Sequence, residues 1–242
     1  MTPVLELKQL HKSYGAIVVA DELSYTLSDG EALGVIGPNG AGKTSMFNLI
    51  TGTVKPSSGD VVFKGQTITA HSAAQRCRAG IARSFQIPQP FGGMSVFENV
   101  LVAATQGAAE SGQRANDLCL EILQQTGLMA RANTRAGGLT LLERKRLELA
   151  RALGAKPSLL LLDEIAGGLT EHECQSLIAT IQDVRASGVS IIWIEHVVHA
   201  LLAVVDRLIV IDFGKKIAEG QPDEIMASRE VQEIYLGIEA DV

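Results

Sequence analysis

Residues 37–44 read Gly37-Pro38-Asn39-Gly40-Ala41-Gly42-Lys43-Thr44 and fulfil the phosphate-binding loop pattern G-x-x-x-x-G-K-[ST]. The apolar run Ala32 to Ile36 precedes them and predicts a buried strand, while the apolar residues of Thr44 to Ile50 recur at helical spacing. In this context glycines let backbone N–H groups turn toward a phosphate, and the helix N-terminus adds positive potential. Lys43 can then reach the β- and γ-phosphates, and the Thr44 hydroxyl can ligate Mg²⁺. The stretch therefore predicts binding of a nucleoside triphosphate.

The composition describes a globular protein with ample material for a core, because 46% of the 242 residues are hydrophobic and 20% are charged. The formal net charge is −6 and the basic residues form no stripe, which argues against a nucleic-acid partner. The densest basic stretch, 144–146, is interleaved with glutamates and predicts a solvated helix face. Cys77, Cys119 and Cys174 are far apart and outside any C-x-x-C spacing, which favours a reducing compartment without zinc.

The sequence shows neither a membrane-spanning segment nor a signal peptide. No apolar run approaches the ~20 residues that a membrane-spanning helix requires. The N-terminal stretch carries a charge at Glu6 and does not resemble a signal peptide. We expect a soluble cytoplasmic protein that reaches a membrane only through a partner.

The predicted elements alternate between strands and helices on both sides of a helical insertion. Alternating residues over 4–10 and a run over 23–27 predict an antiparallel N-terminal sheet. Residues 95–155 show helical periodicity and no convincing strand, so they form an all-helical insertion in an α/β domain. Three capping boxes predict helix starts, at Ser95/Glu98, Thr140/Glu143 and Thr170/Glu173. Further strands are predicted at 60–64, 81–85, 159–162, 189–194 and 208–211, and further helices at 70–79, 197–205 and 222–236.

Polar side chains follow three of these strands. Gln86 follows the strand 81–85, Asp163 and Glu164 follow 159–162, and His196 follows shortly after 189–194. Ligands of parallel sheets collect outside the carboxyl ends of the strands. There Asp163 can hold Mg²⁺, Glu164 can act as general base for the attacking water, and His196 can bind the γ-phosphate. Each residue alone also has a plain structural interpretation, as a helix cap or a packed side chain, and their joint occurrence favours ATP hydrolysis.

With these motifs the sequence resembles the ATP-binding-cassette (ABC) ATPases over essentially its whole length. Residues 37–44 are similar to the Walker A loop, Gln86 to the Q-loop, 159–164 to Walker B with its catalytic glutamate, and Glu195-His196 to the switch histidine. Tyr14 lies where the family has its adenine-stacking aromatic, although from its turn position alone such a tyrosine is more often a packing residue. The family signature, usually L-S-G-G-Q, falls on 139–143.

The resemblance implies a single ABC ATPase domain over 1–242. Its α/β fold would be an ABC-type P-loop NTPase with a RecA-like core, an antiparallel β subdomain and a helical subdomain inserted at about 87–155. It implies ATP and Mg²⁺ as ligands, catalytic roles for Glu164, His196 and Gln86, and metal contacts from Thr44, Gln86 and Asp163. The implied nucleotide contacts are Tyr14, Gly37, Pro38, Asn39, Gly40, Ala41, Gly42, Lys43, Thr44, Ser45 and, in trans across a head-to-tail dimer, Thr140.

Finer features resemble the branched-chain amino acid importer ATPases, namely 80–86, 146–153, Ile194-Glu195-His196 and Tyr235-Leu236-Gly237. This resemblance implies an ATPase that energises a membrane importer for branched-chain amino acids or related small solutes. Its partners would be a second ABC ATPase subunit, identical or different, permease subunits that hold it at the cytoplasmic face of the membrane, and indirectly a solute-binding protein. The segment 87–100 would receive a coupling helix of the permease.

The departures from the family pattern lie in elements that would face the partner chain. Leu141 and Leu142 replace two signature glycines, Glu143 replaces the amide, Ile165 replaces a proline and Thr170 replaces an aspartate. They leave open a second function, a nucleotide-gated clamp with weak hydrolysis. A P-loop kinase or GTPase is disfavoured because the N-K-x-D pattern is absent and Glu164 directly follows Asp163. A chromosome or DNA-repair ABC protein is disfavoured by the acidity and by the lack of a coiled-coil or zinc insertion.

Overall fold

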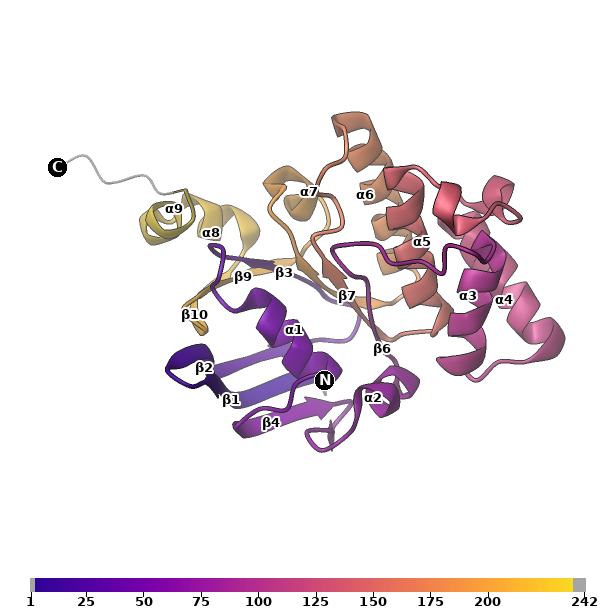
Figure 1. Ribbon diagram of the computed structural model, residues 1–242. Helices are drawn as coiled ribbons and strands as arrows, with labels where there is room; N and C mark the ends of the chain where they lie inside the picture. The colour runs from indigo at the N-terminus through magenta and orange to yellow at the C-terminus, as the bar shows by residue number, and fades with distance from the viewer. Residues whose placement is uncertain (1–2, 237–242) are drawn as a thin grey trace. The chain divides into compact units, whose positions relative to one another are not determined.

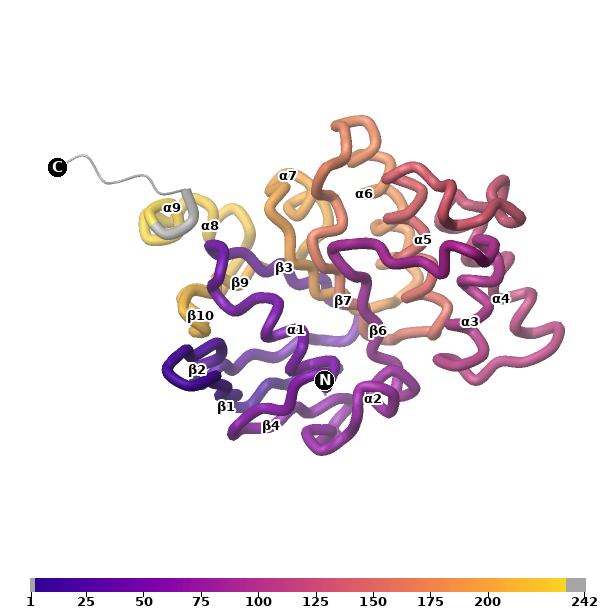
Figure 2. Tube along the Cα trace, in the orientation of Figure 1, coloured from indigo at the N-terminus to yellow at the C-terminus, as the bar shows by residue number. Residues whose placement is uncertain are grey.

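The computed structural model describes residues 3–236, which divide into two compact units. The first unit combines the described parts of Met1–Ala73 and Ser190–Val242, and the second is Ala74–Val189. Figures 1 and 2 trace the elements of each unit. Among these described residues, no helix has both the length and the apolar character needed to cross a membrane.

An antiparallel sheet in the first unit has the strand order β2-β1-β4-β5. Its strands are β1 (Leu5–Tyr14), β2 (Ile17–Leu27), β4 (Ser58–Phe63) and β5 (Gln66–Thr67). The expected antiparallel pairing of the N-terminal strands is confirmed, and both strands are longer than the periodicity predicted. The alternation slips at Gln9, which has a φ of 49°, and the register of β1 with β2 shifts between Leu7 and Leu10. This irregularity shortened the predicted strand, because a bulge breaks the two-residue period.

The first unit also holds a mainly parallel sheet. Strand β3 (Ala32–Ile36) pairs in parallel with β8 (Ser190–Ile194) on one side and with β9 (Arg207–Asp212) on the other. Strand β10 (Lys215–Gly220) is antiparallel to β9. All residues of β3 and β8 are buried, which explains why both read as unbroken apolar runs.

Four helices complete the first unit: α1 (Lys43–Thr51), α7 (Val198–Leu202), α8 (Pro222–Ala227) and α9 (Arg229–Leu236). The helical segment expected from 222 to 236 is therefore two helices, because Ser228 between them has an extended backbone with ψ 127°. Helix α7 is shorter than the predicted 197–205. Gly237, part of the motif that suggested the importer branch, lies outside the described residues.

The second unit carries two paired strands and most of the helical residues. Strand β6 (Ile81–Arg83) is parallel to the fully buried β7 (Leu159–Asp163). The helices are α2 (Ala73–Ala79, beginning at the boundary of the unit), α3 (Val96–Gln106), α4 (Gly112–Gln125), α5 (Leu141–Gly154) and α6 (Glu171–Ala186), with 3₁₀ turns at Met129–Arg131 and Ala136–Gly138. Helices α3, α4 and α5 pack against one another, as Figure 2 shows. As expected, the described stretch 95–155 is helical and has only an isolated bridge, between Ser95 and Arg135.

The three capping boxes start their helices at the predicted residues. Ser95 precedes α3, Thr140 precedes α5 and Thr170 precedes α6, and each hydroxyl accepts from the backbone N–H three residues later. In every case the carboxylate of the glutamate at that position accepts a hydrogen bond from the backbone N–H of the cap residue. The local pattern was sufficient here because both partners lie within one helical turn.

Candidate functional site

The phosphate loop of the first unit joins the C-terminal end of β3 to the N-terminus of α1. Gly37 and Gly42 have φ angles of 152° and 101°. A Cβ atom on Gly37 would lie 2.0 Å from the carbonyl oxygen of Ile211, and one on Gly42 would lie 2.4 Å from that of Val19. The loop can therefore approach its neighbours this closely only with glycine at both positions.

Lys43, the first residue of α1, is buried and its ammonium lies inside the loop. Its Nζ donates to the carbonyl oxygens of Gly37 at 2.7 Å and of Pro38 at 3.0 Å. Asn39, Gly40 and Thr44 are exposed, so the first turn of α1 presents the Thr44 hydroxyl at an accessible helix N-terminus. A fixed ammonium beside exposed backbone N–H groups is the arrangement that binds phosphate.

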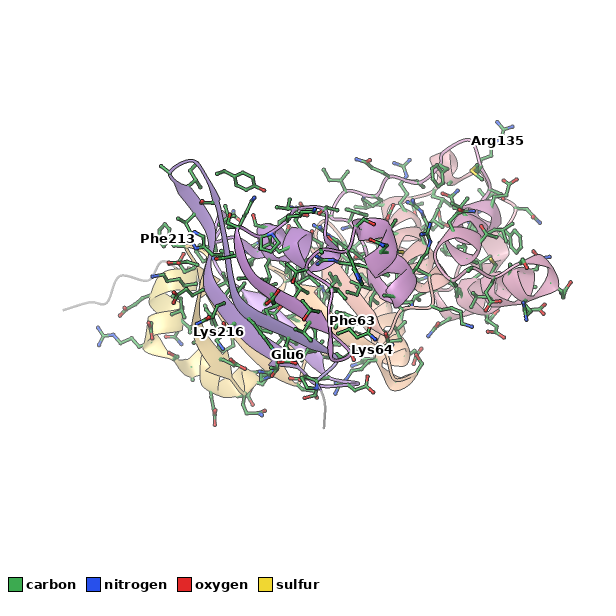
Figure 3. All side chains as sticks on the ribbon, turned by 90° about the horizontal axis from the view of Figure 1, so that it is seen from below. Glu6, Phe63, Lys64, Arg135, Phe213 and Lys216 are labelled. Carbon is green, nitrogen blue, oxygen red and sulfur yellow. The ribbon has the colours of Figure 1, made fainter. Side chains whose placement is uncertain are left out.

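The turn between β9 and β10 is bonded directly to this loop. The N–H of Gly214 donates to the carbonyl oxygen of Ala41 at 2.9 Å, and the carbonyl of Gly214 accepts from the N–H of Asp21, also at 2.9 Å. Phe213 precedes Gly214 and is 81% exposed (Figure 3). The loop is therefore held between the turn and β2.

Tyr14 and His196 are also in the first unit, and both are exposed. Tyr14 ends β1 rather than lying in the following turn, and the Lys12 ammonium lies 5.0 Å from the centre of its ring. His196 follows β8, where its backbone N–H donates to Oε1 of the buried Glu195 at 3.0 Å. Glu195 thus shapes the turn that presents the imidazole, a role that the sequence reasoning did not assign.

In the second unit, Asp163 at the end of β7 is held by β6. Its Oδ2 lies 2.5 Å from Nη2 of Arg83, and its backbone N–H donates to the Ser84 hydroxyl at 3.4 Å. Its other carboxylate oxygen, Oδ1, is buried and has no hydrogen-bond partner among the described residues. A buried acceptor without a donor fits a site that is completed by a metal-bound water. Its free carboxylate oxygen is the kind of group that would bind Mg²⁺ through a water, so the metal role of Asp163 stays a prediction.

Glu164 and Gln86 contact each other in the same unit. Nε2 of Gln86 donates to Oε2 of Glu164 at 2.5 Å. Glu164 has a φ of 47°, an uncommon conformation for a non-glycine residue and one that clusters at functional sites. Strand β6 ends at Arg83, so the prediction that a strand through 85 delivers Gln86 directly was wrong, and Ser84 and Phe85 form an irregular link.

Lys145 of α5 corrects a second prediction. The stretch 144–146 was expected to be solvated, but Lys145 is buried and its Nζ lies 3.4 Å from the carbonyl oxygen of Glu164. Glu148, one turn further, is also buried and accepts from Arg151 at 2.7 Å and from the N–H of Gln89 at 2.8 Å. Charged side chains are almost never fully buried unless they are paired, so the sequence favoured an exposed face here. The partners that allow burial lie elsewhere in the chain and could not be identified from the helical periodicity.

The N-terminus of α5 carries the signature residues and is already capped. Oε2 of Glu143 accepts from the N–H of Thr140 at 2.9 Å, and its Oε1 accepts from Nε of Arg131 at 2.8 Å. Donation from the backbone N–H of Thr140 is the main effect that lowers the pKa of Glu143 below its ordinary range, and donation from the Arg131 side chain adds to it. Leu141 is 46% exposed beside this cap. A phosphate approaching this end meets a carboxylate as well as the Thr140 hydroxyl.

The predicted site residues therefore fall into two sets. The first unit holds Tyr14, residues 37–45 and His196, and the second brings Gln86, Asp163 and Glu164 to neighbouring positions and places Thr140 at the start of α5. Among residues 3–236, no cluster of three or more His, Cys, Asp or Glu side chains is arranged to hold a metal ion. The sequence reasoning missed Arg83 and Lys145, whose only signal was a charged residue next to a buried segment.

Comparison with known protein families gives two matches. Residues 20–167 match the family described as ABC transporter, and residues 215–241 match the family described as branched-chain amino acid ATP-binding cassette transporter. The high-affinity branched-chain amino acid transport ATP-binding protein LivG of Salmonella typhimurium is 32% identical, covering 97% of this chain and 98% of its own. The lipopolysaccharide export system ATP-binding protein LptB of Acidithiobacillus ferridurans is 33% identical, covering 98% of each chain.

Solved structures are similar over nearly the whole chain. A nucleotide-free ATP-binding cassette from an ABC transporter superposes with a TM-score of 0.88 at 28% identity, covering 98% of this chain and all of the other. An ATP-binding cassette of an ABC transporter in its ADP conformation gives the same score, identity and coverage. These likenesses confirm the expected α/β fold of an ABC-type P-loop NTPase.

Proposed function

The chain belongs to the ABC transporter family, whose ATP-binding subunits hydrolyse ATP to drive transport, and on that premise we propose that it energises an importer of branched-chain amino acids or related small solutes. Three sequence relationships support the solute class: the match at 215–241, the likeness to LivG, and the likeness to BraF of Pseudomonas aeruginosa. The observation that carries the ATP-dependent part is the phosphate loop, with its two obligatory glycines and its internal Lys43 ammonium.

We propose a single ABC ATPase domain with a helical subdomain at about 87–155, and we assign roles to its site residues. Tyr14 stacks on the adenine, residues 37–45 bind the phosphates, Thr140 acts in trans, and His196 binds the γ-phosphate. Thr44, Asp163 and Gln86 would hold Mg²⁺, which would supply positive charge to offset that of the phosphates.

Glu164 is the proposed general base. It takes a proton from the water that attacks the γ-phosphate, so that ADP and inorganic phosphate leave. The Gln86 amide at 2.5 Å and the Lys145 ammonium behind the Glu164 carbonyl support the residue in its left-handed conformation. The prediction is that Glu164→Gln retains ATP binding and loses steady hydrolysis.

An exposed apolar surface flanks Gln86 in the sequence and is the proposed docking site for a permease coupling helix. Phe85, Ile87 and Phe91 are exposed, within a segment whose backbone is pinned from two helices. Asn99 of α3 accepts from the N–H of Phe91 at 2.8 Å, and Glu148 of α5 accepts from that of Gln89. Gln86 would link this surface to the γ-phosphate. Gln86→Ala should keep ATP binding and lower transport, and unchanged transport would contradict the coupling role.

The other candidate function is a nucleotide-gated clamp with weak hydrolysis. The specific observation in its favour is the Glu143 carboxylate bonded to the Thr140 N–H at the start of α5. Both functions need a second ATPase subunit at the cytoplasmic face of the membrane. Light scattering of the full chain with ATP, combined with an assay of phosphate release, separates them, since the clamp dimerises on ATP without steady phosphate release.

The deciding experiment reconstitutes the full chain with its permease subunits in proteoliposomes. ATP hydrolysis and uptake of labelled leucine, presented with the cognate solute-binding protein, are measured against the Glu164→Gln variant. We expect both activities to exceed this control. Hydrolysis without uptake of leucine would contradict branched-chain amino acids as the solute. In that case, extraction of lipopolysaccharide is the next assay, because of the likeness to LptB.

A further inference from the structure

Arg83 forms a buried ion pair with the proposed magnesium ligand. Its Nη2 lies 2.5 Å from Oδ2 of Asp163, and the two side chains are only 7% and 5% exposed. A charge-assisted bond of this length is strong, and the surrounding protein leaves little room for either group to move away. The guanidinium therefore fixes the rotation of the carboxylate.

The geometry is reinforced by the residue after Arg83. Ser84 is fully buried, donates its N–H to the carbonyl oxygen of Leu161 at 2.9 Å and accepts from the N–H of Asp163. Arg83 itself is in register with Leu161 across the parallel pair of β6 and β7. Two consecutive residues thus hold the side chain and the backbone of Asp163.

The two oxygens of the Asp163 carboxylate differ in their surroundings. Oδ2 is taken by Arg83, whereas Oδ1 is buried with no hydrogen-bond partner among the described residues. Buried acceptors are normally satisfied, so Oδ1 marks the side from which another donor must come. The ring of Phe85 lies 5.1 Å from the guanidinium carbon and covers the arginine.

We infer that Arg83 is a positioning residue for Mg²⁺ binding, because it holds Oδ2 and so leaves Oδ1 as the carboxylate oxygen that would accept from a metal-bound water. The inference rests on the proposed ATPase function. It assigns Arg83 no contact with nucleotide. Removing a group that orients a metal ligand typically lowers metal affinity by about 10–100-fold.

The test measures binding of the fluorescent probe N-methylanthraniloyl-ATP to the full chain, first in EDTA and then at rising Mg²⁺ concentration. The variants are Arg83→Gln and Arg83→Lys, the second of which keeps the charge if the first does not fold. In EDTA we expect probe affinity close to that of the parent. The Mg²⁺ concentration that gives half of the affinity gain should rise by at least about tenfold.

Arg207→Gln is the matched control. It removes two other ion pairs, one with Glu31, where Nε lies 2.7 Å from Oε1, and one with Glu219, all in the first unit. It should lower the melting temperature and leave the Mg²⁺ dependence unchanged. Parental Mg²⁺ dependence in a folded Arg83 variant would overturn the inference, as would an equal loss of affinity in EDTA, which indicates a general structural role.

Asp163→Asn separates this inference from the proposed function. If the parent gains affinity with Mg²⁺ and Asp163→Asn does not, the proposed role of Asp163 holds and the Arg83 variants decide the inference. If Asp163→Asn behaves like the parent, the metal role of Asp163 is wrong and the inference is overturned with it.

Discussion

Replacing Gly42 with alanine tests how tightly the phosphate loop is packed within the first unit. Gly42 has a φ of 101°, and an added Cβ would lie 2.4 Å from the carbonyl oxygen of Val19 and 3.4 Å from the Cα atom of Gly214. The carbonyl belongs to the backbone of β2 and cannot rotate away as a side chain can. Either the loop or β2 must move, so the substitution should lower both the stability of the protein and its binding of phosphate.

Two effects of the Gly42→Ala substitution lower the free energy of unfolding. A left-handed backbone costs about 1–2 kcal/mol for a residue with a Cβ. Forcing an extra methyl group into a packed site adds about 1–3 kcal/mol. Together these give about 2–5 kcal/mol, and at about 2–4 °C per kcal/mol for a chain of this length the melting temperature falls by about 10 °C.

Gly30→Ala supplies the matched control, because Gly30 has a φ of 73° and an added Cβ meets nothing within 4 Å. Only the backbone cost of about 1–2 kcal/mol remains, and we expect a fall of about 4 °C. Thermal melts with and without ATP measure both effects. Gly42→Ala should also lose the stabilisation that ATP gives, whereas Gly30→Ala should keep it. Equal melting temperatures for the two variants would refute the packing argument.

Three further predictions concern the caps and the core. Thr170→Ala removes the cap of α6 and should cost about 1 kcal/mol in chemical unfolding, with no change of the m-value. Backbone N–H donation, from Ser95, Thr140 and Thr170 respectively, lowers the pKa of Glu98, Glu143 and Glu173. Their depressed folded pKa values add stability above the unfolded pKa that is lost as pH falls below about 5, so a triple glutamine variant should show a shallower acid loss of melting temperature. Leu161→Ala in the buried β7 should cost about 2–5 kcal/mol, and a loss under about 1 kcal/mol would contradict the packing of that strand.

The local sequence predicted those parts of the fold whose partners are close in the chain. The three capping boxes are correct to the residue, because each exchanges bonds between residues three apart. The phosphate loop was equally predictable, since its backbone conformation requires glycines at fixed positions in a short stretch of sequence. The buried strands β3, β7 and β8 were found because burial on both faces leaves an unbroken apolar run.

What could not be predicted depends on residues far apart in the sequence. Arg83 and Asp163 are 80 positions apart, and the pattern around either residue gives no sign of their ion pair. Lys145 is buried because a carbonyl 19 residues later accepts its ammonium, whereas its neighbours suggested a solvated face. The irregular link after β6 likewise depends on distant residues, because Ser84 is bonded to Leu161 and Asp163 of β7.

The pairing of β3 has a consequence for how this protein is made on the ribosome. Both neighbours of β3 come from beyond residue 189, so more than 150 residues are synthesised before the strand can be enclosed. During that interval five apolar residues, followed directly by the phosphate loop, have no strand to pair with. Contacts of such long sequence separation form slowly, and unpaired apolar strands promote aggregation. Translation speed and chaperone access over the last quarter of the chain should therefore determine how much of it matures correctly.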